Sequence, residues 1–528
     1  MITKQVVFDR EVKVFTERPK TITEILNKVA LKYPDKEAIV FQDIRLTYKD
    51  LKNRVDYISV NLQKRFNVNK GDRIALLLNN CVEYFLTTFA CSQLGAIIVP
   101  LNTRLQEKEL AFMLRHSGAK LIIVDEDFKE KLDRIQEEVE LPDLEYKFLV
   151  NWKSEEKNLQ QYFPFEVLEI SSALNVTEIV NEEDPLLIMY TSGTTGTPKG
   201  AILSHIGVVH SVINFKKTLK TNHNTKTLIA VPLFHVTGLI GQLLHMVFIG
   251  GTSVLISRYQ TEVAIKIMDY EKISFLFNVP TMFIMLMSHP LFKTYNFSFV
   301  KTIASGGSSL SLVTINRLRE SFPNAKLHNA YGATETSSPT TIMPVSYQDT
   351  KIASVGLPVP VAELKIVNEE MEECTANEIG ELLIKGPMVV KGYWNNDKAN
   401  SSAFIDGYWL SGDIAMIDED GFVYIMDRKK DMINRGGEKI FSIEVENALY
   451  NHPAVLEAAV VGIPDQMYGE QIKAFIVKRV GEDVTGPEIQ SFLAGKLANY
   501  KIPKEVAFVT ELPKNPGGKV LKNVLMKF

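Results

Sequence analysis

The stretch Leu186-Leu-Ile-Met-Tyr-Thr-Ser-Gly-Thr-Thr-Gly-Thr-Pro-Lys-Gly-Ala201 determines how the rest of the chain is interpreted. An apolar run typical of a buried strand leads into a segment, Thr191 to Gly200, that lacks bulky side chains. Glycines let backbone amides approach an anion closely, and serine and threonine hydroxyls add donors. Lys199 supplies a positive charge, and we expect Ser204 to cap a following helix whose N-terminal end also favours phosphate. The stretch therefore predicts a phosphate-binding loop.

The spacing within this loop differs from that of the common nucleotide loop, which requires Gly-x4-Gly-Lys-Ser/Thr. Here Gly193, Gly196 and Lys199 are each three residues apart, and Gly200 occupies the place of the magnesium-binding hydroxyl. A flexible surface turn is the simplest alternative for a loop of this composition. Residues elsewhere in the chain are needed to decide between the two interpretations.

The first part of the chain alternates strands and helices. Asp72–Leu78 and Ala96–Leu101 are predicted as buried strands on either side of a helix from Cys81 to Gly95. The alternation recurs in the strand Ser274–Val279 and the helix Leu312–Phe322. This pattern predicts an α/β fold of layered sheets covered by helices. A chain of 528 residues is too long for one ordinary domain, so two or more cores are expected.

The sequence pattern changes near Val355, from alternating strands and helices to short strands separated by glycine turns, which continue to about Arg428. They predict a small, largely antiparallel, barrel-like β module. Beyond it, the remaining residues predict a compact α+β domain. Its expected elements are the helices Ile443–Tyr450 and Pro487–Leu497 and the strands Ala458–Ile463 and Ile472–Lys478. We therefore expect a large N-terminal part, residues 1–429, with two α/β subdomains and the β module, and a small C-terminal domain, residues 430–528.

Composition limits the class of protein. A formal net charge of −4 argues against a general nucleic-acid binder, which would normally carry a basic face. The three cysteines, Cys81, Cys91 and Cys374, suggest neither a disulfide framework nor a zinc site. The N-terminus lacks a continuous signal-peptide core, and the most apolar window, Leu243–Ile256, is too short for a membrane span. We expect a cytoplasmic protein, and whether it forms a homodimer is left open.

The full string from Tyr190 to Gly200 resembles the signature of the adenylate-forming superfamily, which comprises acyl-CoA synthetases, adenylation domains of peptide synthetases and beetle luciferases. The resemblance extends along nearly the whole chain, with the motifs in the family's order. It implies an enzyme that uses ATP and Mg²⁺ to form an acyl-adenylate and passes the acyl group to a thiol, most simply coenzyme A. The loop residues that it assigns to ATP are Thr191, Ser192, Gly193, Thr194, Thr195, Gly196 and Lys199.

The segment Ala330-Tyr-Gly-Ala-Thr-Glu335 resembles the family's adenine and magnesium segment. The resemblance places Tyr331 along the base, Thr334 at the α-phosphate, and Glu335 together with Thr191 at the metal. A carboxylate suits Mg²⁺, which takes hard oxygen ligands beside phosphates. The residues that border the adenine in relatives correspond to Ser305, Gly306, Gly307, Asn329, Ala330 and Gly332.

The segment Leu410-Ser-Gly-Asp413 matches the family's ribose site. Two acceptor oxygens of Asp413 suit a vicinal diol, and Arg428 is also expected to reach the ribose. The family more often has threonine where Ser411 stands, a departure that keeps the hydroxyl. The alternative for Arg428 is membership of an exposed charge run.

The resemblance implies that the C-terminal domain moves about a hinge at Lys430. Asn434-Arg-Gly-Gly-Glu-Lys-Ile440 resembles the strand and loop that line the thiol tunnel, where Gly436 and Gly437 let the pantetheine arm pass close to the backbone. Leu512-Pro-Lys-Asn-Pro-Gly-Gly-Lys519 matches the loop with the family's catalytic lysine, and its proline and paired glycines predict an exposed turn. Lys519 is therefore the expected catalytic lysine.

The acyl pocket is expected around Pro232–Leu239, with His235, Val236 and Thr237 at its centre. His235 resembles a gate residue of acyl-CoA ligases, although a packed core histidine is the simpler alternative. Peptide-synthetase domains that take α-amino acids place an aspartate near Val236, and valine cannot pair with an ammonium group. Gly332 stands where acetate-specific relatives carry tryptophan, which predicts a deeper pocket. A fatty or aromatic monocarboxylate fits these features.

Three alternatives share some or all of these motifs. A stand-alone adenylating enzyme would load a separate carrier protein, and because no carrier domain follows Phe528, either acceptor is expected in trans. A luciferase-like oxygenase would also need oxygen and a luciferin. A nucleotide-binding protein without catalysis is disfavoured by the presence of Glu335, Asp413, Arg428 and Lys519.

Overall fold

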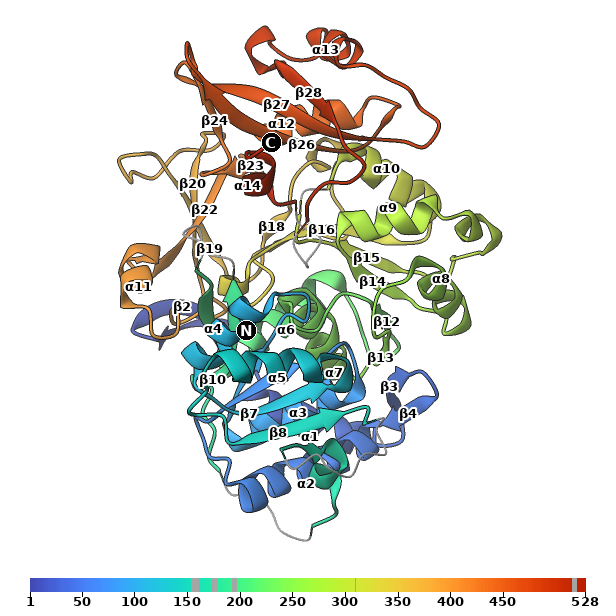
Figure 1. The fold of residues 1–528 in the computed structure, drawn as a ribbon, viewed down its shortest axis with the longest axis vertical. Helices are drawn as coiled ribbons and strands as arrows, with labels where there is room; N and C mark the ends of the chain where they lie inside the picture. The colour runs from blue at the N-terminus through green and yellow to red at the C-terminus, as the bar shows by residue number, and fades with distance from the viewer. Residues whose placement is uncertain (153–160, 173–175, 177, 192–196, 309, 515–519) are drawn as a thin grey trace.

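The computed structural model describes residues 1–152, 161–172, 176, 178–191, 197–308, 310–514 and 520–528. It is a mixed α/β structure, as the sequence predicts. Figure 1 shows the N-terminal α/β part at one end of the molecule, a second α/β layer beside it, and the C-terminal elements β24 to β28 at the opposite end.

The first large sheet has seven strands in the order β11-β10-β6-β5-β7-β8-β9. Its neighbours are parallel except for β10 and β11. The strands are β5 Arg73–Leu77, β6 Ile97–Pro100, β7 Ala119–Asp125, β8 Tyr146–Val150, β9 Phe163–Pro164, β10 Pro185–Thr191 and β11 Lys199–Ser204. The associated helices are α3 Val82–Leu94, α4 Glu107–Ser117 and α5 Lys129–Glu138. The predicted strand–helix–strand unit from Asp72 to Leu101 is thereby confirmed.

The second large sheet has nine strands in the order β18-β17-β16-β15-β14-β12-β13-β3-β4. Its middle strands are parallel, and both edges are antiparallel. The strands are β3 Glu37–Phe41, β4 Ile44–Thr47, β12 Lys226–Ile229, β13 Thr252–Leu255, β14 Phe275–Asn278, β15 Thr302–Ser305, β16 Lys326–Tyr331, β17 Thr341–Ile342 and β18 Leu357–Pro358. The helices of this part are α1 Ile22–Lys32, α2 Tyr48–Phe66, α6 His205–Leu219, α7 His245–Ile249, α8 Thr261–Tyr270, α9 Pro280–Ser288 and α10 Leu312–Ser321.

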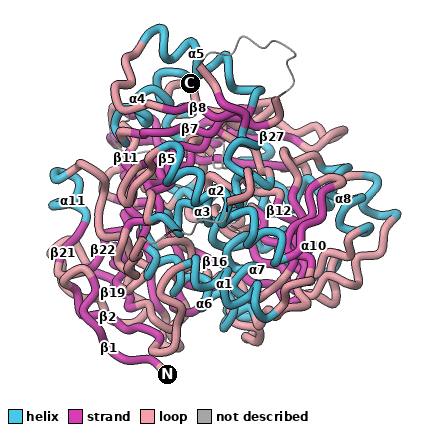
Figure 2. Tube along the Cα trace, turned by 90° about the horizontal axis from the view of Figure 1, so that it is seen from below, coloured by secondary structure: helices cyan, strands magenta, loops and turns pink. Residues whose placement is uncertain are grey.

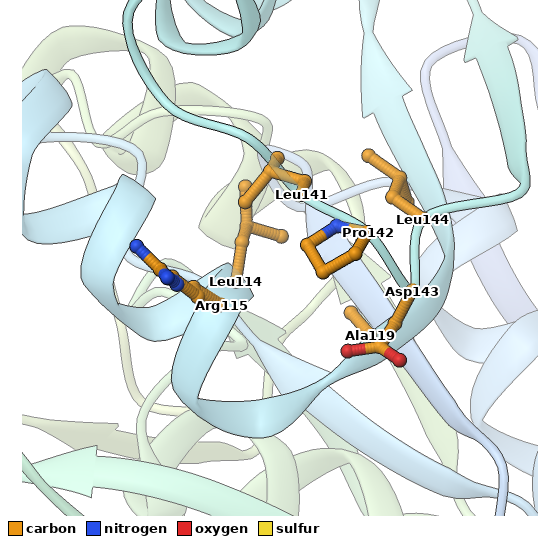
Figure 3. A pocket seen from close by; sticks show the side chains of 7 residues that line it. All are labelled: Leu114, Arg115, Ala119, Leu141, Pro142, Asp143 and Leu144. Carbon is orange, nitrogen blue, oxygen red and sulfur yellow. The ribbon is translucent and has the colours of Figure 1, made fainter.

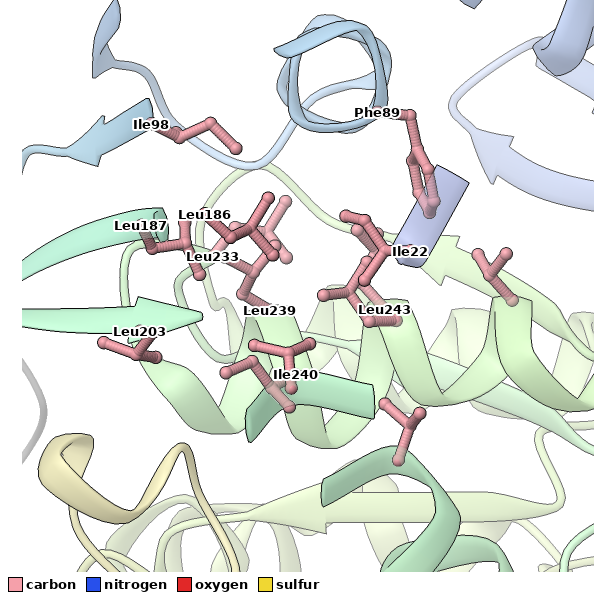
Figure 4. Close-up of a cluster of buried hydrophobic side chains, with 14 of the residues drawn as sticks. Ile22, Phe89, Ile98, Leu186, Leu187, Leu203, Leu233, Leu239, Ile240 and Leu243 are labelled. Atoms are coloured by element: carbon pink, nitrogen blue, oxygen red, sulfur yellow. The ribbon is translucent and has the colours of Figure 1, made fainter. Parts of the chain in front are cut away.

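One hydrophobic core joins the first sheet to a π-helical segment, η3 Thr237–Leu244. Figure 4 shows side chains of β6, β10 and β11 meeting Leu239, Ile240 and Leu243 of this segment, with Phe89 of α3 and Ile22 of α1 close by. Burial of such aliphatic side chains contributes about 1.5–3 kcal/mol each. The core therefore fixes both the end of β10, where the phosphate loop begins, and the chain that enters η3.

The β module is a five-stranded antiparallel sheet. Its elements are β19 Glu363–Val367, β20 Gly380–Lys385, α11 Asp397–Ala403, β21 Phe404–Ile405, β22 Tyr408–Ile417 and β23 Val423–Arg428. The hairpin of β1 Ile2–Val7 and β2 Arg10–Phe15 lies beside this module (Figure 2), and Arg10 donates to the carbonyls of Val390 and Lys391. The sequence did not predict this hairpin.

The C-terminal elements form a separate five-stranded sheet with hydrophobic clusters of its own. They are β24 Ile433–Arg435, β25 Glu438–Ile440, α12 Ser442–Tyr450, β26 Val455–Asp465, β27 Gly469–Lys478, α13 Gly486–Ala494, β28 Glu505–Phe508 and α14 Lys522–Leu525. The two predicted helices and two predicted strands of this region are confirmed within a few residues at their ends.

The fully buried histidines predict loss of stability in acid. Burial lowers the pKa of His205 and His210 to about 4 and that of His245 to about 3. In the unfolded chain a histidine has a pKa of about 6.5, so below that pH unfolding takes up a proton at each site. The stabilising contribution is complete above pH 6.5 and is lost as the pH falls toward 4.

We expect the free energy of unfolding to fall by about 2 kcal/mol per histidine between pH 7 and pH 5. Urea unfolding followed by fluorescence measures this. In a His210→Gln variant the slope with pH should be shallower, because one proton fewer is taken up. An unfolding midpoint that does not change over this pH range would contradict the prediction.

Candidate active site

The phosphate loop connects two neighbouring antiparallel strands. Thr191 at the end of β10 pairs with Lys199 at the start of β11. The remaining loop residues predicted to bind ATP, Ser192, Gly193, Thr194, Thr195 and Gly196, lie outside the described residues. The loop thus begins and ends at one fixed pair of backbone positions, which are held by the sheet.

The expected contribution of a helix N-terminus to this loop is wrong. Ser204 does cap α6, because its Oγ accepts a hydrogen bond from the Gly207 amide at 3.3 Å. However, β11 separates the loop from the helix, and Ser204 pairs with Pro185 at the opposite end of the hairpin. The macrodipole acts only near the helix terminus, so α6 does not favour phosphate at the loop.

Glu335 lies against the start of this loop. Its Oε1 accepts a hydrogen bond from Thr191 Oγ1 at 3.3 Å, although 144 positions separate the two residues. Glu335 belongs to a short 3₁₀ turn, Thr334–Thr336, and is 8% exposed. Burial raises the pKa of its carboxyl group. Within the described part of the chain no lysine or arginine forms an ion pair with this carboxylate, so its negative charge is left for a cation to balance.

The backbone after Glu335 is strained. Ser337 and Ser338 have φ values of 49° and 101°, a region that residues other than glycine seldom adopt. The Thr336 hydroxyl donates to the Ala333 and Ser338 carbonyls and stabilises the turn. This geometry turns the chain sharply directly behind the carboxylate.

Tyr393 is a residue of this site that the sequence analysis missed. Its hydroxyl donates to the same Glu335 Oε1 at 3.0 Å, and the Lys199 ammonium lies 5.2 Å from its ring centroid. In the sequence, Tyr393 is one aromatic residue among several in the β module. No local pattern connects it to Thr191 or Glu335.

Residues of the predicted ribose site come together as expected. Asp413 on β22 pairs in register with Arg428 on β23, and Arg428 Nε lies 3.4 Å from Asp413 Oδ1. Tyr331 donates its hydroxyl to Asp413 Oδ2 at 2.5 Å, which joins the predicted adenine and ribose segments. The Ser411 hydroxyl accepts from the Asp413 amide at 3.0 Å and donates to the Leu382 carbonyl. The hydroxyl retained at Ser411 therefore has a structural role.

The predicted adenine border lies at the carboxyl ends of two adjacent parallel strands. Ser305 of β15 and Asn329 of β16 pair in register. Asn329 Nδ2 donates to the Ser354 carbonyl, whereas the buried Ser305 hydroxyl has no partner among the described residues. A Cβ at Gly306 would lie 2.9 Å from the Ala330 carbonyl, so glycine is needed where these two segments meet. Gly307 follows with a positive φ.

The predicted acyl segment contains a buried, unpartnered polar atom. Within the described residues His235 Nε2 has no hydrogen-bond partner, and burial lowers the pKa of this histidine to about 4. The imidazole is therefore neutral at pH 7. Val236 packs against the main core, and Thr237 begins η3. His235 and Val236 thus lie directly before η3, whose residues from Gly238 to Leu244 are buried.

The predicted role of Gly332 in the depth of the acyl pocket is wrong. The absent side chain was expected to deepen the acyl pocket, but a Cβ at Gly332 would lie 1.6 Å from the Ser338 carbonyl oxygen. The space is therefore filled by backbone. Glycine is required here because the strained turn after Glu335 folds back against Gly332.

Two of the three regions predicted beyond Arg428 are described. Lys430 is exposed in the turn that follows β23. Gly436 and Gly437 form the turn between β24 and β25, with φ values of 63° and 95° that favour glycine. Lys519 lies outside the described residues.

A cavity of about 240 Å³ opens at the carboxyl ends of strands from both large sheets. Ligands of open α/β sheets bind at such edges. Its lining residues follow β5, β6, β7, β12 and β13, and they are Asn79, Asn80, Thr103, Arg104, Phe128, Ala230, Pro232, Phe234, Ser257, Arg258 and Tyr259. Pro232 and Phe234 come directly before His235, so the cavity adjoins the predicted acyl segment.

A second crevice lies away from these residues, between α4, β7 and the segment 141–144 (Figure 3). It is too narrow to hold even a water molecule. Arg115 and Asp143 are its charged residues, and it is too small to hold a ligand.

The described residues contain neither a clustered metal site nor a membrane-spanning helix. No group of three His, Cys, Asp or Glu side chains gathers there as a metal site. None of the helices in these residues combines the length and apolar composition needed to cross a bilayer.

Comparisons with known proteins agree with this geometry. A family model described as AMP-binding enzyme matches residues 26–394, and one described as AMP-binding enzyme C-terminal domain matches residues 444–519. The long-chain-fatty-acid–CoA ligase of Bacillus subtilis is 32% identical, over 96% of this chain and 94% of its own.

Two solved structures are similar over almost the whole chain. The structure of an anthranilate CoA ligase in complex with anthranoyl-AMP has a TM-score of 0.89 and 26% identity, over 96% of both chains. That of the o-succinylbenzoate coenzyme A synthetase of Bacillus subtilis with ATP and magnesium ion has a TM-score of 0.81 and 30% identity, over 94% of this chain and 98% of that one.

A buried ion pair beside the predicted hinge predicts a large effect of one substitution. Lys522 Nζ lies 2.8 Å from Glu446 Oε1, and both side chains are mostly buried. Removing the lysine leaves an uncompensated buried carboxylate, which typically costs about 3–5 kcal/mol. We therefore expect Lys522→Met to destabilise the C-terminal elements by roughly that amount in urea unfolding. The double variant with Glu446→Leu should recover most of the loss, and failure to do so would contradict this assignment.

Proposed function

The chain belongs to the AMP-binding enzyme family and is an AMP-forming carboxylate–CoA ligase, and from this premise we propose that it activates a fatty or aromatic monocarboxylic acid. In the first step a carboxylate oxygen attacks the α-phosphorus of ATP, the bond to pyrophosphate breaks, and acyl-AMP forms. In the second, the thiol of coenzyme A attacks the acyl carbon and AMP leaves. The observation that supports adenylation is the contact between Thr191 and Glu335, which joins the phosphate loop to the predicted metal ligand.

The described residues have complementary roles in holding ATP. Asp413 and Arg428 bind the ribose hydroxyls, and Tyr331, which donates to Asp413, lies along the adenine. Thr334 and Lys199 contact the phosphates. Because both reactants are anions, these groups must neutralise charge and hold the carboxylate in line with the bond that breaks.

The donor set at Glu335 fits Mg²⁺. This ion binds through one or two carboxylates together with substrate phosphates, and it needs no dedicated cage of side chains. Glu335 is a buried carboxylate with two hydroxyl donors and no cationic partner among the described residues. Glu335 and Thr191 would hold the metal, which supplies charge neutralisation at the phosphates when bound.

The proposal also assigns roles to the C-terminal part of the chain. We assign residues 1–429 and 430–528 to two domains with the hinge at Lys430, and Lys519 to charge stabilisation during adenylation. Gly436 and Gly437 then line the path of the thiol after the domain rotates. Support comes from the tight glycine turn between β24 and β25 and from the separate core of the C-terminal sheet.

The cavity before His235 supports coenzyme A as the acceptor. Arg104 and Arg258 line it together with amide and hydroxyl side chains, a set suited to a phosphorylated ligand rather than to an apolar acyl chain. The rings of Phe128 and Tyr259 offer apolar surface for a nucleobase. A carrier protein acting in trans is the alternative acceptor, and the test below separates the two.

The residues around His235 limit which acids the enzyme can bind. This imidazole is neutral, and Val236 provides no carboxylate to pair with an α-ammonium group. Free monocarboxylic acids therefore fit better than amino acids. The relatives act on long-chain fatty acids, anthranilate and o-succinylbenzoate, by their names, so aliphatic and aromatic acids both remain candidates. We assign the enzyme to the cytoplasm, which its three free cysteines fit.

The proposed function is tested with a panel of acids, comprising acetate, octanoate, palmitate, ferulate, anthranilate and phenylalanine, assayed by pyrophosphate release with ATP and Mg²⁺. A fatty or aromatic acid should give the highest rate, and coenzyme A should be converted to its thioester without a carrier protein. Arg258→Gln should raise the KM for coenzyme A about tenfold, the loss of one charge-assisted contact, and leave acyl-AMP formation unchanged. A preference for phenylalanine or acetate would overturn the substrate assignment.

Lys519→Ala should slow adenylation by about 10²–10³, as for the loss of one charge-stabilising donor. Thioester formation from preformed acyl-AMP should be affected much less. Lys514→Ala is the matched control, because Lys514 is ion-paired with Glu457 at 2.7 Å on the other side of the same segment. Equal losses in both half-reactions would rule out separate conformations for the two steps.

A further inference from the structure

We infer that Tyr393 is a positioning residue that orients the Glu335 carboxylate for Mg²⁺ and holds Lys199 beside it. The inference rests on the proposed function, because it assumes that Glu335 binds the metal of Mg-ATP. It concerns a residue of the β module that has no expected role in either step.

The first support is the contact with the carboxylate. Tyr393 is 5% exposed, and its hydroxyl donates to Glu335 Oε1 at 3.0 Å, a shorter contact than the 3.3 Å from Thr191. Burial, together with the neighbouring carboxylate, raises the pKa of the phenol, so it remains a proton donor at neutral pH. Two hydroxyls on one oxygen fix the plane of the carboxylate.

The second support is the contact with the loop lysine. Lys199 Nζ lies 5.2 Å from the centre of the Tyr393 ring, within the range of a cation–π interaction. One side chain thus contacts the anionic and the cationic group of the phosphate site. No direct ion pair joins Lys199 to Glu335 among the described contacts, so both charges remain available for metal and phosphate.

The third support is the rigidity of the Tyr393 backbone. The segment around it runs antiparallel to β11: Ala201 forms a bridge with Tyr393, and Trp394 donates to the Gly200 carbonyl at 2.7 Å. Asn400 of α11 accepts from the Tyr393 amide at 2.7 Å and donates to its carbonyl at 3.1 Å. The tyrosine is therefore held from both sides, by the phosphate hairpin and by α11.

These contacts define what Tyr393 does in the reaction. Groups that hydrogen-bond to a metal-binding carboxylate orient it, and their loss typically reduces metal affinity by about 10–100-fold. A tyrosine that served only to fill the core would contribute through its ring and not through its hydroxyl. Removing the hydroxyl alone therefore separates the two roles.

The test is calorimetric titration of ATP, without acid or coenzyme A, in excess Mg²⁺ and in EDTA. In Tyr393→Phe the ratio of the Kd for ATP in EDTA to the Kd in excess Mg²⁺ should fall about tenfold. The Kd in EDTA itself should stay within about twofold of the wild type. In Tyr393→Leu the Kd in EDTA should also rise, by about two- to fivefold, because Lys199 loses the ring. Glu335→Gln should abolish the effect of Mg²⁺.

Tyr424→Phe is the matched control. Its hydroxyl also donates to a carboxylate, Asp418 Oδ2 at 3.2 Å, within the same β module, and among the described residues it has no hydrogen bond to the phosphate hairpin. It should leave both affinities unchanged. If Tyr393→Phe also matches the wild type, or weakens ATP equally with and without Mg²⁺, the inference is wrong while the proposed function stands. If the wild type itself binds ATP no better with Mg²⁺, the assignment of Glu335 is wrong and the inference fails with it.

Discussion

The hydrogen bond from Thr191 to Glu335 is the constraint on which the rest of the site depends, because its two residues come from different sheets. Thr191 ends β10 of the seven-stranded sheet, and Glu335 follows β16 of the nine-stranded one. The two can meet only if the sheets pack in one orientation. The core that joins β6, β10 and β11 to η3 provides that orientation, since its aliphatic side chains are almost fully removed from water.

A buried carboxylate is costly unless it is partnered, and the two central carboxylates are partnered differently. Asp413 accepts from Tyr331 and lies beside Arg428, which is nearly half exposed. Glu335 has hydroxyl donors instead. A ribose site needs acceptor oxygens that stay in place without a metal, so a permanent cation beside Asp413 is compatible with the role proposed for it. A metal site needs a carboxylate whose charge is not already neutralised, which is consistent with the role proposed for Glu335.

The sequence predicted those parts of the site whose residues lie in contiguous motifs. Glu335, Asp413 and Arg428 were named as site residues in this way, and the structure pairs Asp413 with Arg428 in register. The strand–helix alternation also predicted the layered α/β fold. Hydrophobic periodicity carries this information locally, so no long-range contact had to be known.

The errors and omissions share a physical cause, which is that each depends on a backbone pairing or packing contact that no sequence motif displays. The segment from Lys199 to Ser204 was not recognised as a strand, since its pairing with β10 defines it, and α6 was therefore placed too close to the loop. Gly332 was explained by pocket depth, whereas the Ser338 carbonyl occupies the space. Tyr393 acquires its role only when the β module packs against β11.

The pairing of β22 with β23 also matters for the proposed rotation of the C-terminal domain, because the predicted ribose residues lie on these two strands. With the hinge proposed at Lys430, Asp413 and Arg428 both lie on its N-terminal side, so rotation leaves their pairing intact. Asp427, one residue earlier, instead accepts from the Ser442 amide and hydroxyl at 2.5 and 2.7 Å, across the hinge. Rotation must break these contacts and expose a carboxylate that is 2% exposed here. Asp427 therefore favours the present orientation, while the proposed ribose site at Asp413 is unchanged by the rotation.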